Sequence, residues 1–309
     1  MITYFKSENN QICPIPGLEP GCWVNMIHPD EEEIASVSQA LELDPAFLRA
    51  ALDEEETSRI EVEDDVTLLI VDIPYSEEQK KDGGMLFSTL PLAILVTKQN
   101  VVTVSLEETS VVRDFAGGLV KNVNTAMKTR FTLNLMLRAA GKYLFHLRQI
   151  EKISSKIEGE LYKSLKNKEL IQLLTLEKSL VYFTTSLKST ETTLEKLLRG
   201  RILKLYEEDQ DLLEDVIIEF KQAIEMADIY SSILSGTMDA FASVISNNLN
   251  IIMKVLTVIT ILMTIPNIVF SFYGMNVQDM PLPHTWFPVS LSIAITGLTW
   301  LLLKKKNLY

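Results

Sequence analysis

The motif Tyr273-Gly274-Met275-Asn276 is the clearest candidate for a functional site in this chain. It ends one long apolar run and opens the short loop before a second, close to the C-terminus. Gly274 permits a tight backbone turn, and the Asn276 carboxamide presents an oxygen that accepts hydrogen bonds. This placement between two apolar runs predicts the mouth of an ion pathway. Alternatively, Gly274 is a helix C-cap and Asn276 an ordinary turn residue.

Polar residues recur along the first apolar run at steps of three, four and seven, which puts them on one face of a helix. Polar groups are tolerated in a membrane where they line water or a protein contact, so the stripe indicates copies of this helix around a wet axis. Alternatively, the hydroxyls bond their own backbone or pack between helices, although carboxamides are harder to satisfy locally. Pro266 can kink this helix and free a carbonyl. The stripe comprises Asn250, Thr257, Thr260, Thr264, Asn267, Ser271 and Gly274.

Four carboxylates upstream are spaced three, four and four residues apart, which puts them on one face of a predicted helix. Like charges so placed repel each other unless a cation or a basic partner neutralises them, so the four residues are candidate cation ligands. A solvated acidic surface is the alternative. The four are Glu208, Asp211, Asp215 and Glu219.

Two uncharged apolar runs position the motif, and each exceeds the roughly 20 residues that a helix needs to cross a bilayer. Trp286 and Trp300 lie near the two ends of the second run, where their rings favour the headgroup level. The transmembrane part therefore spans residues 251–309, with a first span at 251–273, an outer loop at 274–285, a second span at 286–303 and a basic tail at 304–309.

Flanking charges predict the orientation of these spans. Lys304 to Lys306 follow the second span, whereas the connecting loop carries only Asp279 and His284, so we expect a cytoplasmic C-terminus. An even number of spans then places the N-terminal part in the cytoplasm too, consistent with the lack of a signal-like apolar stretch in the opening residues. In a prokaryote the membrane would be the plasma membrane.

Charge separates the chain into two parts. The last 59 residues hold four Lys and one Asp, so of the 29 basic and 41 acidic residues the first 250 hold 25 and 40. This acidic part argues against nucleic acid, whose phosphates need a basic footprint. Cys13, Cys22 and three histidines show no zinc-ligand spacing, and a reducing compartment disfavours a disulfide. Without a nucleophile–base pair or phosphate loop, we expect neither an enzyme nor an organic cofactor.

The soluble part shows two regimes. Residues 1–123 predict an α/β domain, with helices starting at Asp30 and at Asp44-Pro45 because these residues form N-terminal capping signals. Residues 124–250 hold no proline and few glycines, which predicts very long helices. A helix through both the soluble part and the first span would be roughly 100 Å long and would need partner helices or subunits. Expected strands are 22–27, 66–71, 91–96 and 101–105, and expected long helices are 125–165, 168–198 and 207–273.

The long helix entering the membrane, the Gly-Met-Asn motif at its outer end, Met280-Pro281 in the loop and the terminal lysines together resemble the CorA-type magnesium channels. The tripeptide alone is weak evidence for this family, but its position between two C-terminal spans makes the evidence specific. Trp23-Val24-Asn25 and the strand at Leu68–Ile70 also resemble the family's N-terminal domain. The resemblance implies a funnel-shaped homopentamer whose first spans surround the pore and whose second spans form an outer ring.

The resemblance also implies site roles. Mg²⁺ dehydrates reluctantly, so a ring of Asn276 carboxamides suits a hydrated ion, with Gly274 and Met275 shaping the loop. Met253 and Leu256 would form an apolar constriction that gates by dewetting. The implied pore-lining residues are Asn250, Met253, Leu256 or Thr257, Thr260, Thr264, Asn267 and Ser271.

Regulation by Mg²⁺ bound between subunits is implied as well, and a count back from Asn276 places Asp215 at the family's regulatory position. Partner carboxylates could come from Glu77-Glu78 or Asp82. The chain departs from the family's pattern in the loop, where Met280-Pro281-Leu282-Pro283 lacks the acidic residue that usually follows the first proline in the family. Asp279 then either concentrates cations at the mouth or is an ordinary turn residue.

These expectations describe a passive channel for hydrated Mg²⁺, with Co²⁺ or Ni²⁺ as further ions, closed by internal Mg²⁺. Its partners would be divalent cations, the lipid bilayer and further copies of itself, but not nucleic acid. Two alternatives remain open: a zinc-transporting relative of the same architecture, and a membrane-anchored scaffold or sensor that does not transport.

Overall fold

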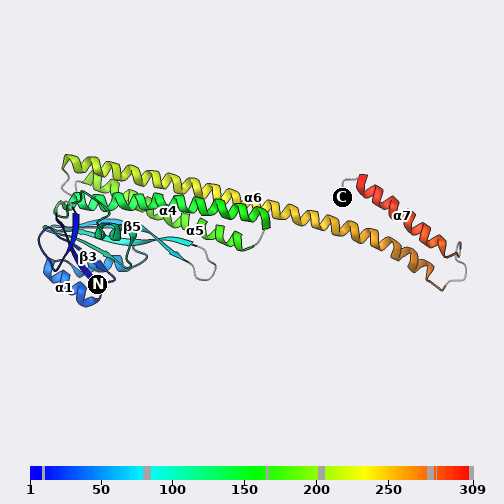
Figure 1. Cartoon of the computed structure of the whole chain (residues 1–309), viewed down its shortest axis with the longest axis horizontal. Coiled ribbons are helices and arrows are strands. Elements are labelled where there is room, and N and C mark those ends of the chain that lie inside the picture. Colours follow the sequence, from blue (N-terminus) through cyan, green and yellow to red (C-terminus); the bar gives the residue numbers. More distant parts are fainter. Residues whose placement is uncertain are drawn as a thin grey trace. The chain divides into compact units, whose positions relative to one another are not determined.

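The computed structural model describes residues 1–8, 11–78, 85–164, 167–200, 206–276, 282 and 284–305. These residues form two compact units, 1–236 and 237–309, which are described separately. Figure 1 shows the elements of both units. One helix, α6, contributes residues to each.

The described residues of the first unit form a seven-stranded sheet with the order β2-β1-β3-β7-β6-β5-β4. Neighbouring strands are antiparallel except for the parallel pair β3 and β7. The strands are β1 (Ile2–Glu8), β2 (Gln11–Ile15), β3 (Trp23–Ile27), β4 (Arg59–Glu63), β5 (Val66–Glu78), β6 (Met85–Val96) and β7 (Val101–Ser105).

Helices cover the sheet and build the second unit. α1 begins at Asp30 with the predicted reciprocal capping box to Glu33, and Asp44 caps α2 by accepting the N–H of Ala46. The described helices are α1 (Glu31–Leu41), α2 (Pro45–Arg49), α3 (Ser110–Ala116), α4 (Lys128–Ser164), α5 (Asn167–Gly200), α6 (Glu207–Tyr273) and α7 (Trp286–Lys305), with a 3₁₀ turn at Ala50–Leu52.

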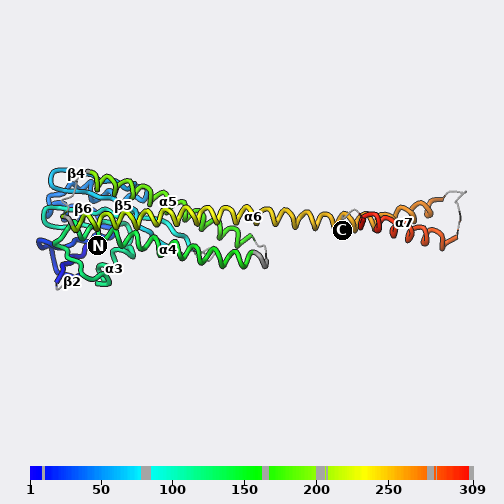
Figure 2. Tube along the Cα trace, turned by 90° about the horizontal axis from the view of Figure 1, so that it is seen from above, coloured from blue at the N-terminus to red at the C-terminus, as the bar shows by residue number. Residues whose placement is uncertain are grey.

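Alternating side chains of the strands form two apolar layers. Val24 of β3 and Ile70 of β5 pack with Ile34 of α1 on one face. Trp23 points to the other face, where its ring centroid lies 5.3 Å from that of Phe131 on α4. Figures 1 and 2 show α4 and α5 side by side on this second face. The sheet is therefore buried between helices on both sides.

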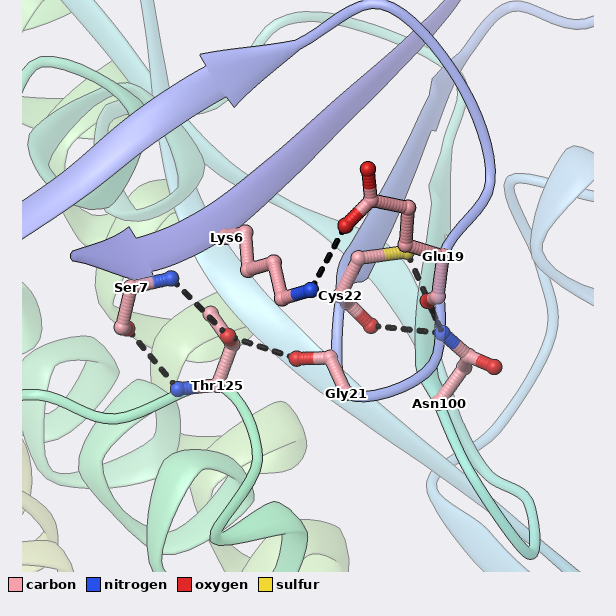
Figure 3. A network of polar contacts seen from close by, with 7 residues as sticks. All are labelled: Lys6, Ser7, Glu19, Gly21, Cys22, Asn100 and Thr125. Atoms are coloured by element: carbon pink, nitrogen blue, oxygen red, sulfur yellow. Dashed lines mark hydrogen bonds and ion pairs between the residues drawn. The ribbon is translucent and has the colours of Figure 1, made fainter.

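The start of α4 is fastened to the sheet by a polar network (Figure 3). The hydroxyl of Thr125 donates to the carbonyl of Gly21 at 2.7 Å, and the Thr125 N–H donates to Ser7 Oγ at 2.9 Å. Gly21 has φ +77°, and a Cβ there would lie 3.3 Å from the Cβ of Ala126, so glycine fits this close approach. The junction fixes where the long-helix region begins.

The long helices match their predicted ranges within a few residues, and the four predicted strands are present. β5 and β6 extend further than expected. Before Leu92, strand β6 pairs with β5 but not with β7, so a proline such as Pro91 is tolerated there. Three strands and one helix were missed. β1, β2 and β4 are half-exposed and carry polar residues, so they lack a continuous apolar run, and α3 is only seven residues long.

Asp72 is a carboxylate buried between β5 and α5. Burial raises the pKa of its carboxyl to about 6, and hydrogen bonds from Ser186 and Ser58 lower it only in part. The folded-state pKa exceeds the ordinary value of 3.8, so the folded protein binds more protons than the unfolded chain between these values. The free energy of unfolding therefore falls as pH rises through this window and stays lower above pH 6.

Asp72→Asn is expected to raise the apparent Tm of the full-length protein at pH 7.5, because it removes a buried charge that costs on the order of 3 kcal/mol. Near pH 4 the difference from the unmodified protein should vanish. Asp114→Asn is the control and should change the Tm in the opposite direction. Burial alone would raise the pKa of Asp114, but hydrogen bonds from Lys142 and Arg138 hold it below its ordinary value. A lower Tm for Asp72→Asn at pH 7.5 would contradict this account.

Candidate ion-conduction site

The predicted motif lies at the end of α6. α6 ends at Tyr273, and the N–H of Gly274 donates to the carbonyl of Phe270 at 2.8 Å. A Cβ on Gly274 would lie 3.2 Å from that carbonyl oxygen, so a larger residue would require the backbone to shift. Met275 and Asn276 follow and are exposed in the single chain. The glycine therefore lets the chain leave the helix while Asn276 stays accessible.

The segment after the motif leads to α7. The expected mouth carboxylate Asp279 and the residues Met280, Pro281 and Pro283 lie outside the described residues. α7 begins at Trp286, and the ring of Phe287 lies 6.1 Å from that of Tyr273 between centroids. The start of α7 thus packs beside the end of α6.

The polar stripe of α6 faces away from α7. Leu262 and Pro266 border a groove shared with α7, and Val258 and Val269, on the same side of α6, are only 6% and 8% exposed. At 100° per residue the predicted lining residues project from the opposite side. Each of them is exposed: Asn250, Met253, Leu256, Thr257, Thr260, Thr264, Asn267 and Ser271.

The threonine hydroxyls of this stripe donate to their own helix. Thr257 donates to the carbonyl of Met253 at 2.7 Å, Thr260 to that of Leu256 at 2.8 Å, and Thr264 to that of Thr260 at 2.7 Å. The alternative that hydroxyls bond their own backbone is therefore correct for these three. Their protons are committed, but the lone pairs on each oxygen still accept hydrogen bonds. The face they form is an acceptor surface.

Carboxamides complete that surface. Within the part of the chain that the structure describes, the side chains of Asn250, Asn267 and Asn276 make no hydrogen bond to another residue. Met253 and Leu256, at 59% and 56% exposure, form the apolar section near the first of these asparagines. A hydrated cation presents the hydrogens of its water shell outward, so a row of acceptor oxygens can hold it without removing that shell.

The four predicted carboxylates of α6 have different partners. Glu208 forms an ion pair with Arg130 of α4, so its charge is already neutralised within the chain. Asp211 and Asp215 are exposed and Glu219 is half-buried. No Lys or Arg among the described residues lies within 4.0 Å of these three. The structure therefore separates Glu208 from the remaining three carboxylates.

Sequence reasoning missed Asp209, which is 5% exposed. Its carboxylate lies 3.3 Å from Nε of Arg130 and accepts the N–H of Tyr206 at 3.3 Å, so it caps the start of α6 and ties it to α4. An acidic residue near a helix start was the available signal for Asp209. Arg130 gave none, because it lies 79 residues earlier in the sequence.

Large apolar side chains share the carboxylate face of α6. Ile218, Ile229 and Ile233 are 60%, 54% and 56% exposed and project to the same side as Asp211 and Asp215. Across the described ranges, no group of three or more His, Cys, Asp and Glu side chains is placed to hold a metal. Glu77 is exposed at the end of β5, whereas Asp82 lies outside the described residues. A cation at Asp215 would therefore need ligands from outside this set.

Comparison with known proteins finds relatives that match most of this chain. The cobalt/magnesium transport protein CorA of Methanocaldococcus jannaschii is 28% identical over 290 residues, which are 88% of this chain and 86% of the relative. The complete structure of the CorA magnesium transporter from that organism matches with a TM-score of 0.82 at 20% identity, covering 100% of this chain and 99% of the other.

A third match shows the fold of the soluble part. The ZntB cytoplasmic domain from Vibrio parahaemolyticus RIMD 2210633 aligns with a TM-score of 0.60 at 12% identity, covering 80% of this chain and 96% of the other. At these identities the two structural likenesses establish the fold only.

Family membership follows from the sequence match. α6 and α7 are the two described helices that are long and apolar enough to span a membrane. A family model described as "CorA-like Mg2+ transporter protein" matches residues 19–305, which include both helices and the Gly-Met-Asn motif. This chain is an integral membrane protein that belongs to the CorA-like Mg²⁺ transporter family.

Proposed function

We propose that copies of this chain, five by resemblance, form a passive channel that conducts hydrated Mg²⁺ inward along the membrane potential. The observation that carries the proposal is the acceptor face of α6, which runs from Asn250 to Ser271 on the side opposite α7. In lipid such a face is costly unless it lines water or another protein surface. Copies of α6 around an axis would turn this face toward a water-filled pore.

Assembly is supported by the soluble part of α6. The exposed isoleucines Ile218, Ile229 and Ile233 form an uncovered apolar strip on a long helix. Such a strip marks a protein contact surface, and a second copy of the same helix is the proposed partner. The proposed division is a cytoplasmic α/β domain at 1–123, a long-helix region at 124–250 and a membrane domain at 251–309, with both termini in the cytoplasm.

Selection is assigned to the outer end of α6. A ring of Asn276 carboxamides, positioned by Gly274 and Met275, would accept hydrogen bonds from the water shell of the ion. Neutral oxygens attract a hydrated ion weakly enough for it to leave again, which conduction requires. Oxygen acceptors also favour Mg²⁺ over Zn²⁺, which prefers nitrogen and sulfur ligands. Co²⁺ and Ni²⁺ are further candidate ions.

Closure is assigned to two sections of α6. Met253 and Leu256 would narrow the pore with apolar side chains and exclude water when the helices approach each other. Cytosolic Mg²⁺ bound at Asp215, with Asp211 and Glu219 nearby, would neutralise carboxylates that otherwise repel their counterparts on neighbouring chains. Glu208 would contribute less, because Arg130 already pairs with it.

A flux experiment tests the proposal. Purified protein in liposomes should pass Mg²⁺ inward, and the flux should rise as internal Mg²⁺ is removed. Asn267→Leu is expected to lower this flux about tenfold or more, because it places an apolar group among the acceptors. If the flux does not change with internal Mg²⁺, the regulatory role assigned to the α6 carboxylates is wrong. If assembled wild-type protein passes no divalent cation, the scaffold alternative replaces the channel.

A further inference from the structure

A groove separates α7 from the membrane part of α6. It has a volume of about 460 Å³ and is bordered by Leu262 and Pro266 of α6 and by Ser292, Thr296 and Gly297 of α7, among others. Figure 1 shows α7 running beside this part of α6. A Cβ added to Gly297 would meet nothing within 4 Å, so the small residues of α7 leave this space open.

On the α6 side of the groove, one lining residue has a carbonyl without its usual donor. Pro266 lies inside α6, which continues to Tyr273. Proline has no N–H, so the carbonyl of Leu262, four residues earlier, cannot form the ordinary helical hydrogen bond. In a membrane no bulk water replaces that bond, and neighbouring helices or ordered waters usually supply the missing donor.

The α7 side of the groove holds the complementary group. The hydroxyl oxygen of Thr296 is buried and has no hydrogen-bond partner among the described residues. Thr257, Thr260 and Thr264 of α6 differ, because each donates to a carbonyl one turn earlier in its own helix. The residues that line the groove therefore include a threonine on α7 with a buried, unbonded hydroxyl and a leucine on α6 whose carbonyl lacks its helical donor.

We propose that Thr296 is a positioning residue of the ion pathway: in the membrane-embedded assembly its hydroxyl, which is unbonded in the single chain, donates to the Leu262 carbonyl across the groove. The proposal rests on the proposed function, because the position of α6 matters for transport only if α6 lines the pore. Asn267 follows Pro266 directly and projects into the acceptor face. By fastening α6 to α7 at this point, the bond would set the rotation of Asn267.

A double-mutant cycle tests the pairing in the full-length protein in lipid nanodiscs and liposomes. Thr296→Val removes the hydroxyl at nearly constant shape and is expected to lower the apparent Tm and to reduce Mg²⁺ flux about three- to tenfold. Thr296→Ser should restore both. In the Pro266→Ala background residue 266 regains an N–H for the Leu262 carbonyl, so Thr296→Val should have little effect there. Thr299→Val, outside the groove, is the matched control and should behave as wild type.

The outcomes separate this pairing from the channel itself. Equal losses from Thr296→Val in both backgrounds, or failure of Thr296→Ser to restore them, would show that Thr296 acts by packing alone and would overturn the pairing. If Thr296→Val lowers the Tm only when Pro266 is present, but even the wild-type protein transports no cation, the proposed function is refuted and the pairing stands. Coupled changes in both Tm and flux would support both.

Discussion

Replacing Asn276 with alanine is expected to lower Mg²⁺ flux about 10- to 100-fold while the protein still assembles, by analogy with the loss of outer-shell metal contacts. The side chain follows the end of α6, is exposed and bonds to no described residue, so truncation removes acceptor groups without removing packing. In the proposed channel, an ion that keeps its water shell would then lose the contact assigned to Asn276 at the mouth. The measurement is Mg²⁺ flux into liposomes at low internal Mg²⁺.

Asn248→Ala is the matched control for this change. Asn248 lies on α6 but projects away from the acceptor face, so the same truncation should leave flux close to wild type. Assembly of both variants is checked by their size in solution before flux is compared. An Asn276→Ala variant that assembles and conducts at the wild-type rate would show that the Gly-Met-Asn motif is not the selective ring.

Asp211→Asn combined with Asp215→Asn is expected to raise the internal Mg²⁺ concentration that halves flux by about tenfold or more. These two carboxylates are exposed and have no cationic partner in the described part of the chain, so they are free to bind a cation at a contact between copies. Their amides keep the shape but carry no charge. The variant channel should therefore stay open at internal Mg²⁺ concentrations that close the wild type.

Asp228→Asn is the control on the same helix. Asp228 pairs with Lys188 of α5 at 3.1 Å, so it should have no part in cation-dependent closure. Glu208→Gln provides a graded test, because the ion pair with Arg130 predicts an effect smaller than that at Asp215. If the double variant closes at the wild-type Mg²⁺ concentration, the regulatory site lies elsewhere.

The long elements were predictable because their causes are local. Helix length followed from the absence of proline between Pro91 and Pro266, and the start of α1 followed from the capping pair Asp30 and Glu33. The spans followed from length and apolarity alone. β1 and β4 were missed, because an edge or half-exposed strand needs no apolar run and its partners lie far away in the sequence.

The candidate site was predictable in its residues but not in their partners. The position of Gly274 at the end of α6 and the common face of the polar residues follow from helical periodicity. The pairing of Glu208 with Arg130 depends on how α4 packs against α6, which no local pattern encodes. The orphaned hydroxyl of Thr296 likewise becomes visible only when α7 is placed beside Pro266.

Thiol accessibility tests the central claim that the acceptor face of α6 lines water. In a background without Cys13 and Cys22, single cysteines replace the neighbours Thr257 and Val258, which project about 100° apart on α6. Thr257 is exposed on the acceptor face, whereas Val258 is only 6% exposed on the side of α7. A water-soluble cationic thiol reagent at low internal Mg²⁺ should modify Thr257→Cys and block Mg²⁺ flux, while Val258→Cys should stay unreactive and keep its flux. Block at Val258→Cys with no reaction at Thr257→Cys would contradict the account.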